Sequence, residues 1–368
     1  MEKFMALPLD KVLKNRIKSF NLPEPLGFGK VPCPIMAACH FKGGKWTDVE
    51  LTAYAPLEID PSAKVLHYGQ QIFEGMKSYK NGDRNPILFR PELNFKRFNT
   101  SALRMAMPEV PEEHFQQAVA NMVHYLTPCI PVGEGESLYI RPFMFATQPG
   151  LGLASSEEYT FLVIASPSGA YFSADRVAVL VERQDCRAAP GGTGNVKVAG
   201  NYGGSIKSAL KARDLGYHQT LWLDAATRQN IEELSGMNFF AVIAGELYTP
   251  KLTDSLLPGI TRTSLIDLAR DFGLKVHEKS MDIDHLIADI KSQRCTEVFA
   301  CGTAAVLTPI TELGEADGTR YVLKEPYGPV SQKLRDALTQ IQGQALEDKF
   351  GWIKEVPGWY ESSPELRA

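Results

Sequence analysis

A glycine-rich stretch from Cys186 to Gly204, CRAAPGGTGNVKVAGNYGG, holds the residues whose types and spacing best suggest chemistry. Lys197 is its only lysine, and Tyr202 follows five residues later. Glycines allow positive φ angles and a close approach of other groups, so this loop can enclose its lysine in a tight, partly dry hollow. Burial disfavours the charged form of a lysine, and such a lysine can serve as a Schiff-base nucleophile toward an aldehyde.

Two other structures are compatible with a loop of this composition. In the first, the loop lies at the surface and its lysine is solvated. The second is a phosphate-cradling loop of the GxxxxGK[ST] type, and its spacing fails because Val196, not glycine, precedes the lysine. The loop alone does not distinguish a buried, nucleophilic Lys197 from a solvated one, so the surrounding sequence is needed.

Four motifs occur in the order GNVKVAGNY, EELSGMNFF, LPGITR and GTAAVLTP. Together they make the sequence similar to the branched-chain amino acid aminotransferases, from about Leu22 to Trp352. That family is pyridoxal 5'-phosphate dependent and of fold type IV. The resemblance implies an α/β (α+β) fold with two α/β domains, the cofactor at their interface, and Lys197 as its Schiff-base partner.

Length and composition limit the classes of function. A chain of 368 residues with a formal net charge of −4 can form two domains and has no basic run for nucleic acid or an acidic membrane. We therefore expect small-molecule partners, with no nucleic acid and no membrane. The six cysteines and seven histidines lack metal-ligand spacing, so we expect reduced thiols and no metal. Without a signal, transit or membrane-spanning pattern, the expected location is the cytoplasm.

The expected elements around the loop divide the chain in two. A short apolar strand is expected at Tyr159–Ser166, and a second, RVAVLVE, follows the turn-rich PSGAYFSAD. We expect a smaller N-terminal α/β domain at 1–168, an interdomain loop at 169–176, and a larger C-terminal domain at 177–368. The resemblance implies that the loop is mobile over the active site and that Tyr171 faces the pocket.

Several aromatic and charged residues of the first domain are candidates for substrate binding. Phe28 in LGFGK, and Tyr68 and Phe73 in LHYGQQIFEGMK, are compatible with an ordinary core. The resemblance implies instead that they line the substrate pocket, with Tyr68 supplied by the partner subunit of a homodimer. Tyr139 and Arg141 share one face of an alternating strand, which is either a solvated edge or a carboxylate site. By resemblance, Tyr139 contacts the substrate carboxylate and Arg141 helps admit glutamate.

Arg90 and one of two adjacent glutamates are candidates for cofactor binding. Arg90 lies at a strand–helix junction, where an arginine is usually a surface ion-pair member, and the resemblance assigns it to the phosphate. Glu232 and Glu233 precede a strand and would face opposite ways in an extended segment. A carboxylate at the pyridine nitrogen keeps it protonated and strengthens the ring as an electron sink. The family pattern selects Glu233 for this role, places Tyr202 on the phenolate oxygen, and leaves Glu232 solvated.

Two backbone turns are further candidates for binding the phosphate. Gly259 lies just ahead of a helix, so the amides of Ile260 and Thr261 are expected at a helix N-terminus, which favours anions. Thr261 is equally compatible with an ordinary N-cap. The segment Gly302-Thr303-Ala304, directly after the strand TEVFAC, is a second candidate for an anion-holding turn. The resemblance assigns Thr303 to the phosphate, and both Thr303 and Ala304 to the substrate.

The resemblance implies reversible amino transfer between leucine, isoleucine or valine and 2-oxoglutarate, with Lys197 as general base and acid. A D-amino acid aminotransferase and a 4-amino-4-deoxychorismate lyase are alternatives of the same fold, and the Tyr139–Arg141 pair weighs against both. A non-catalytic phosphate- or nucleotide-binding protein is the alternative from another class. Ala305 and Thr308 occupy the positions of the redox CxxC of mammalian relatives, which excludes a thiol switch by that route.

Overall fold

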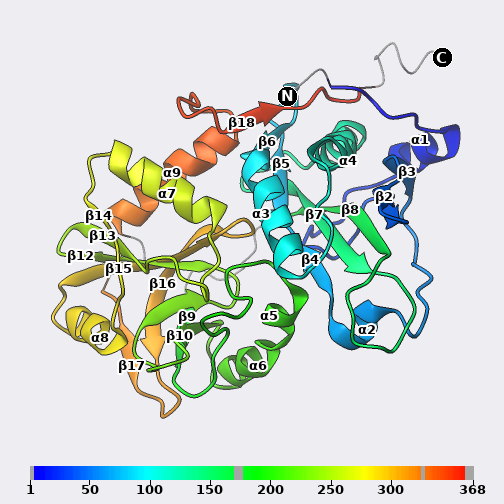
Figure 1. Cartoon of the computed structure of the whole chain (residues 1–368). Helices are drawn as coiled ribbons and strands as arrows, with labels where there is room; N and C mark the ends of the chain where they lie inside the picture. The colour runs from blue at the N-terminus through cyan, green and yellow to red at the C-terminus, as the bar shows by residue number, and fades with distance from the viewer. Residues whose placement is uncertain (1–3, 170–176, 325–327, 361–368) are drawn as a thin grey trace. The chain divides into compact units, whose positions relative to one another are not determined.

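The computed structural model describes most of the chain. The described residues are 4–169, 177–324 and 328–360. They form two compact units, each with a nine-stranded sheet (Figure 1). Within these three ranges, no helix is both long enough and apolar enough to cross a membrane.

The first unit comprises Met1–Tyr171 and Ile341–Ala368, and the second comprises Phe172–Gln340. The expected second domain ran from 177 to the C-terminus, and the structure places the chain from Ile341 onward with the first unit instead. The expected interdomain loop falls almost entirely on 170–176, outside the described residues, and stays a prediction.

The described strand pairs of the first unit are all antiparallel. The strands are β1 (Ile35–Lys42), β2 (Lys45–Trp46), β3 (Glu50–Ala53), β4 (Gln71–Phe73), β5 (Met76–Tyr79), β6 (Ile87–Phe89), β7 (Ser137–Ala146), β8 (Tyr159–Ser168) and β18 (Ile353–Glu355). Their order is β18-β6-β5-β7-β8-β1-β2, with β3 beside β1 and β4 beside β7. The helices are α1 (Lys11–Lys18), α2 (Lys64–Tyr68), α3 (Pro91–Arg104) and α4 (Glu112–Tyr125), with a 3-10 turn at Thr127–Cys129.

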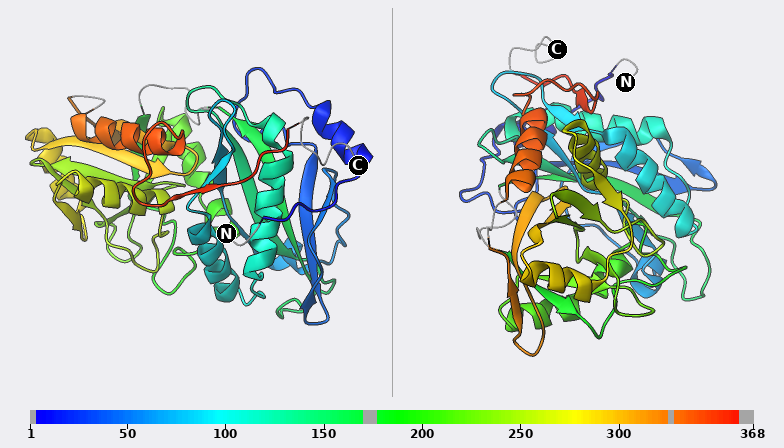
Figure 2. Two further views of the ribbon diagram at one scale, coloured as in Figure 1. Left: turned by 90° about the horizontal axis from the view of Figure 1, so that it is seen from above. Right: turned by 90° about the vertical axis from the view of Figure 1, so that its left-hand side faces the viewer.

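One face of this sheet is covered by α3 and α4, with α4 lying along β1 and β8 (Figure 2). The apolar stripe predicted for α4 is buried there, and its Phe115 stacks on Phe161 of β8 with ring centroids 5.9 Å apart. Phe161 is paired with Met144 of β7. Because successive side chains of a strand alternate, Tyr139 and Arg141 of β7 point to the other face.

The last strand explains why the C-terminal segment belongs to the first unit. Ile353 of β18 pairs with Phe89 of β6, and the Arg90 N–H donates to the Trp352 carbonyl at 2.8 Å. Without β18, β6 would be an edge strand with unpaired backbone groups. A three-residue strand has too short a pattern to be recognised in the sequence, which is why the expected boundary was wrong here.

The second unit has a mixed sheet. Its strands are β9 (Val177–Glu182), β10 (Gln219–Leu223), β11 (Ile231–Leu234), β12 (Asn238–Ile243), β13 (Glu246–Thr249), β14 (Val276–Glu278), β15 (Cys295–Gly302), β16 (Val306–Gly314) and β17 (Arg320–Val322). Their order is β11-β10-β9-β16-β15-β12-β13-β14, with β17 beside β16. A further pairing of β11 with β12 closes six of these strands into a ring. The helices are α5 (Ala199–Gly203), α6 (Ile206–Asp214), α7 (Ile260–Asp271), α8 (Ile283–Lys291) and α9 (Pro329–Gln342).

One core cluster of this unit lies between α8 and one face of the sheet. Asp282 caps α8 by accepting the N–H groups of the first turn, and the apolar residues follow at helical spacing. They share a buried cluster with Phe239 and Ala241 of β12. Asn238 and Phe240, which alternate with these residues, point to the opposite face of the strand, and Asn238 takes part in the site described next.

Candidate active site

Lys197 and Tyr202 contact each other in the second unit. Lys197 Nζ lies 2.8 Å from the Tyr202 hydroxyl and 5.0 Å from the centre of its ring. The short helix α5 brings Tyr202 back toward the lysine, and Asn201 fixes the loop by donating to the carbonyls of Thr193, at 2.7 Å, and Val196, at 3.0 Å. Lys197 is half-buried between buried neighbours, which disfavours a freely solvated loop.

The lysine loop is packed tightly against the segment that precedes α7. A Cβ atom at Gly194 would lie 2.5 Å from the Cα of Ser255 and 2.6 Å from the Cβ of Ala188, so only glycine fits. The next residue, Asn195, donates its N–H to the Asp254 carbonyl at 2.9 Å. Two backbone segments that are distant in sequence are therefore held side by side next to Lys197.

Glu233 lies in a buried ionic cluster in the same unit. Arg187 Nη2 is 2.5 Å from Glu233 Oε1, and both side chains are almost fully buried. Asn238 Nδ2 donates to Oε2 at 2.9 Å, and the Leu257 N–H approaches Oε1 at 3.4 Å. Burial raises the pKa of Glu233 to about 7, while Arg187, the Leu257 N–H and Lys197 act to lower that pKa.

Glu232 is also buried, at 5% exposure, so the expectation that it is solvated was wrong. The reason is an irregularity in β11: Leu221 of β10 pairs with Leu234, but Leu223 pairs with Ile231. Glu232 and Glu233 of β11 thus lie opposite the single residue Trp222 of β10, and both Ile231 and Leu234 reach the core cluster. Such a bulge re-aims the side chains between its ends, so simple alternation does not apply to the two glutamates.

The N-terminus of α7 adjoins this cluster. Gly259 is the N-cap, so the alternative of Thr261 as N-cap was wrong. No side chain in the described part of the chain caps this end, and the amides of Ile260 and Thr261 lie in its first turn. The Asn238 side chain, which also donates to Glu233, occupies the space that a Cβ of Gly259 would need. The helix N-terminus and the buried carboxylate are therefore neighbours.

Thr303 and Ala304 lie in the turn between β15 and β16. Gly302 pairs with Val306, which leaves a short turn between the two strands. A Cβ on Gly302 would lie 3.3 Å from both the Gly236 carbonyl oxygen and Met237 Cγ. Gly302 therefore lies against the connection between β11 and β12, next to the Glu233–Asn238 pair. The second unit brings the predicted cofactor residues Lys197, Tyr202, Glu233, Ile260, Thr261 and Thr303 to neighbouring segments.

The first unit brings four predicted pocket residues together. Arg141 Nη2 lies 3.1 Å from the Tyr139 hydroxyl, which confirms that the two share a face. The Phe28 ring packs edge-on against Tyr139 at 4.8 Å, and the Arg141 guanidinium lies 4.9 Å from the centre of the Phe73 ring. A Cβ on Gly75 would collide with the Tyr139 hydroxyl, so this glycine makes room for the phenol.

The remaining candidates of the first unit lie on other elements. Arg90 adopts a left-handed conformation, with a φ of 49°, as the N-cap of α3, and its guanidinium lies 5.0 Å from the centre of the Trp352 ring. Tyr68 ends α2, is partly exposed, and donates its hydroxyl to the Leu151 carbonyl. Tyr171 lies outside the described residues.

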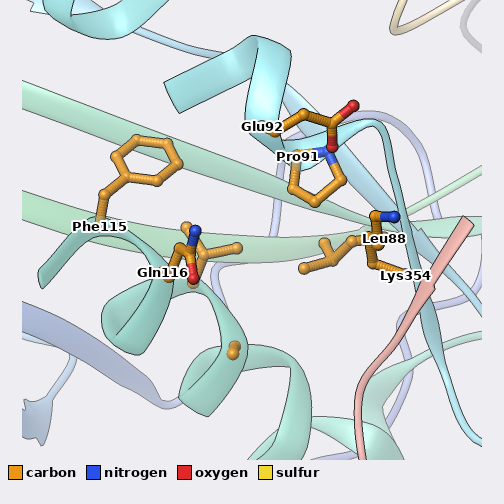
Figure 3. A pocket seen from close by; sticks show the side chains of 8 residues that line it. Leu88, Pro91, Glu92, Phe115, Gln116 and Lys354 are labelled. Atoms are coloured by element: carbon orange, nitrogen blue, oxygen red, sulfur yellow. The ribbon is translucent and has the colours of Figure 1, made fainter. Parts of the chain in front are cut away.

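A separate apolar pocket of about 290 Å³ lies on the other side of this sheet (Figure 3). It is lined by Leu88, Pro91, Glu92, Phe115, Gln116, Val119, Ala120 and Lys354. Leu88 pairs with Ser78, whereas the preceding residue of β5, Lys77, pairs with Tyr139. Paired residues share a face and neighbours alternate, so this pocket opens on the α3–α4 side, away from Tyr139.

Sequence reasoning missed Arg187. It stands in the same glycine-rich stretch as Lys197, and in addition to Glu233 it contacts the carbonyls of Gly194, at 2.8 Å, and Ser255, at 2.7 Å. The available signal was a second cation followed by two alanines and a proline just ahead of the glycines. A cation in a loop that folds tightly around its glycines needs a partner when it is buried, and Arg187 finds its partners on other segments of the fold.

Comparisons with known proteins agree with this geometry. Residues 71–313 match the family model of amino-transferase class IV. A probable branched-chain-amino-acid aminotransferase of Staphylococcus epidermidis is 45% identical over 337 residues, covering 90% of this chain and 94% of that protein. The Escherichia coli branched-chain amino acid aminotransferase structure has a TM-score of 0.72 and 29% identity, covering 87% of this chain and 99% of that one.

A third relative carries a bound derivative of the cofactor. This branched-chain amino acid aminotransferase from T.th., complexed with N-(5'-phosphopyridoxyl)-L-glutamate, has a TM-score of 0.69 and 25% identity, covering 87% of this chain and 99% of that one. These matches confirm the predicted α/β fold of type IV and the predicted family. The chain belongs to the class IV aminotransferases, which depend on pyridoxal 5'-phosphate, and within them to the branched-chain-amino-acid aminotransferases.

Proposed function

We propose that the chain catalyses reversible amino transfer between leucine, isoleucine or valine and 2-oxoglutarate, with pyridoxal 5'-phosphate bound at Lys197. The observation that carries the proposal is the contact of Lys197 Nζ with the Tyr202 hydroxyl at 2.8 Å, in the same unit as the buried carboxylate of Glu233. Pyridoxal 5'-phosphate carries an aldehyde, a ring oxygen and a ring nitrogen. The lysine can bind the aldehyde, the phenol can hydrogen-bond to the ring oxygen, and the carboxylate can pair with the protonated ring nitrogen.

The residues of the second unit fit this cofactor. The first turn of α7 offers the amides of Ile260 and Thr261, and its N-cap Gly259 has no side chain to compete for them. Thr303 adds a hydroxyl from the β15–β16 turn, and Arg90 of the first unit would add a planar cationic fork to the phosphate. When bound, the cofactor supplies an electron sink that acidifies the Cα–H of an amino acid.

Three side chains would serve the proton transfer itself. Lys197 Nζ would take the proton from the substrate Cα as general base and would then deliver it, as general acid, to the former aldehyde carbon of the cofactor. Tyr202 holds Lys197 Nζ in place and hydrogen-bonds to the ring oxygen. Glu233, in its ionised form, favours a protonated ring nitrogen. Because Arg187 lies 2.5 Å from this carboxylate, the buried site keeps a countercharge when the carboxylate is ionised.

Substrate recognition is assigned to the first unit and to one turn of the second. Phe28 and Phe73 would form apolar walls for a branched side chain. The contact between Tyr139 and Arg141 supports a carboxylate site, in which Arg141 accommodates the second carboxylate of glutamate. The turn residues Thr303 and Ala304 would bind the α-carboxylate of either substrate, and Tyr171 is proposed as a further pocket residue.

We further infer a homodimer in which Tyr68 completes the partner's site. Support comes from large apolar side chains that are exposed around α2 and the loop it contacts, namely Leu66, Tyr68, Leu151 and Leu153. Exposed apolar patches commonly mark protein interfaces. Leu153→Asp would place a charge in this patch, and light scattering is then expected to show monomers. The cytoplasm is the proposed compartment, supported by six free cysteines.

The proposed reaction is tested directly with purified protein. Leucine and 2-oxoglutarate should yield glutamate, whereas D-leucine should yield none, which separates this activity from a D-amino acid aminotransferase. The protein should be coloured, and borohydride reduction followed by peptide mapping should label Lys197. Lys197→Ala should fold and lose both label and turnover, while Lys207→Ala, an exposed lysine paired with Asp185, should retain both. A colourless protein, or label on another lysine, contradicts the proposal.

A further inference from the structure

Arg187 is a buried guanidinium that joins three segments of the second unit. Its side chain is 3% exposed. Nη2 contacts the Gly194 carbonyl in the lysine loop at 2.8 Å, the Ser255 carbonyl ahead of α7 at 2.7 Å, and Glu233 Oε1 in β11 at 2.5 Å. One side chain therefore fixes the loop that carries Lys197 relative to the buried carboxylate.

The contact between Arg187 and Glu233 affects the ionisation of a group of buried charges. Burial and the neighbouring Glu232 raise the pKa of Glu233, while Arg187 and Lys197 act to lower that pKa. Burial raises the pKa of the nearby Cys301 thiol, and the charge of Glu233 adds to that shift. Glu232 is itself held by the Ser255 hydroxyl, so this second carboxylate stays close to Arg187. Removing Arg187 would leave two buried carboxylates without their principal countercharge.

We propose that Arg187 is a positioning residue that orients Glu233 toward the cofactor ring and favours its ionised form. The inference rests on the proposed function, in which Glu233 pairs with the ring nitrogen. Arginine suits the role because its guanidinium is always charged and its planar donors have fixed directions. The two carbonyl contacts prevent the guanidinium from turning away, so its direction toward Glu233 is set before any ligand binds.

The main test is a double-mutant cycle on cofactor affinity, measured by titrating the apo-protein with pyridoxal 5'-phosphate. The variants are Arg187→Met, Glu233→Gln and the two combined. Arg187→Met removes the cation that is paired with Glu233 and should weaken binding about ten- to a hundredfold, a loss of the same size as that of one hydrogen bond to a charged group. If Arg187 acts through Glu233, the double variant should bind no more weakly than Glu233→Gln alone. If the loss of cofactor affinity in the double variant equals the product of the losses in the two single variants, the proposal is overturned.

A cofactor analogue separates positioning from general damage to the fold. In 1-deaza-pyridoxal 5'-phosphate the ring nitrogen is replaced by C–H, so Glu233 has no charge to pair with. Arg187→Met should therefore change the affinity for the analogue much less than the affinity for the cofactor. In the cofactor-bound protein, the absorption spectrum of the cofactor ring changes with pH. The midpoint of that spectral transition should lie at higher pH in Arg187→Met, since Glu233 then ionises at higher pH. An equal loss of affinity for both compounds would show a purely structural role.

Two further variants serve as controls. Arg187→Lys retains the charge, so its spectral transition should stay near that of the wild type although its affinity falls, and it replaces Arg187→Met if the latter does not fold. Arg183→Met removes another arginine of this unit, paired with Glu315 at 2.7 Å, and should bind the cofactor normally. If the wild type fails to bind the cofactor, the proposed function is wrong; if it binds and only the cycle fails, Arg187 alone is misassigned.

Discussion

The carboxylates of Glu232 and Glu233 are adjacent and both buried, yet their substitution should have different consequences. Glu233→Gln removes the charge proposed for the ring nitrogen, so turnover should fall at least about a hundredfold, as for other electrostatic groups of active sites. Burial is the main cause of the raised pKa of Glu233, and the negative charge of Glu232 raises that pKa further. Glu232→Gln should therefore retain most turnover and move the acidic limb of the pH–rate profile to lower pH. Equal losses of turnover would mean that the wrong glutamate has been assigned.

Substitution of Arg141 should slow the half-reaction with glutamate and leave the half-reaction with leucine nearly unchanged. Its guanidinium contacts the Tyr139 hydroxyl and lies over the Phe73 ring, between a polar and an apolar wall. Arg141→Met keeps the apolar bulk and removes the charge, which should cost the half-reaction with glutamate about ten- to a hundredfold. The half-reaction with leucine should change much less, and single-turnover spectra with each amino acid distinguish the two.

The matched control for Arg141 is Tyr139→Phe, which keeps the ring and removes only the hydroxyl. That hydroxyl is proposed to contact the carboxylate common to both substrates, so leucine and glutamate should lose similar amounts. If Arg141→Met also impairs both substrates alike, Arg141 is structural or binds the common carboxylate, and its assignment to the second carboxylate of glutamate is wrong.

At the scale of elements, the approach of the lysine loop to the segment before α7 depends on Gly194. A Cβ there would meet backbone atoms of Ser255, which cannot rotate away as a side chain could. Gly194→Ala should therefore displace the loop, lower the temperature of thermal unfolding, and weaken cofactor binding by an order of magnitude or more, about the effect of one lost charged hydrogen bond. Thermal unfolding and cofactor titration measure the two effects.

Gly200 offers a control within the same loop. It lies in α5, where an added Cβ meets nothing within 4 Å. Gly200→Ala should bind the cofactor normally and unfold at the same or a slightly higher temperature, because alanine in a helix is favoured over glycine by about 0.5–1 kcal/mol. A loss as large as that of Gly194→Ala would show that the loop tolerates no change at all and that the contact with Ser255 is not the cause.

The sequence predicted the elements whose patterns are long and regular. The stripe of α4 and the alternation that places Tyr139 beside Arg141 are examples. It did not predict features set by pairing between distant segments. The bulge that buries Glu232 depends on how β11 meets β10, and Arg187 finds its three partners only once the loop is folded. The return of the C-terminal segment to β6 depends on three residues, too few to show a period.

At the scale of the whole molecule, the C-terminal segment should be essential to the first unit. Trp352 is buried, stacks on Phe350 with ring centroids 4.2 Å apart, packs edge-on against Phe89, and supports the guanidinium of Arg90. Trp352→Ala should lower the free energy of unfolding by about 3–5 kcal/mol, the usual range for a buried tryptophan. Glu355→Ala, at an exposed position of β18, should change it by less than about 0.5 kcal/mol.

The same two variants test whether the packing of Trp352 against Arg90 also supports cofactor binding. If Arg90 binds the phosphate, losing the ring beneath its guanidinium should also weaken cofactor binding, while the borohydride label stays on Lys197 because that residue belongs to the other unit. Denaturant unfolding and cofactor titration of Trp352→Ala and Glu355→Ala measure both effects. Normal affinity in a destabilised Trp352→Ala protein would separate Arg90 from the phosphate. Unchanged stability would contradict the assignment of the C-terminal segment to the first unit.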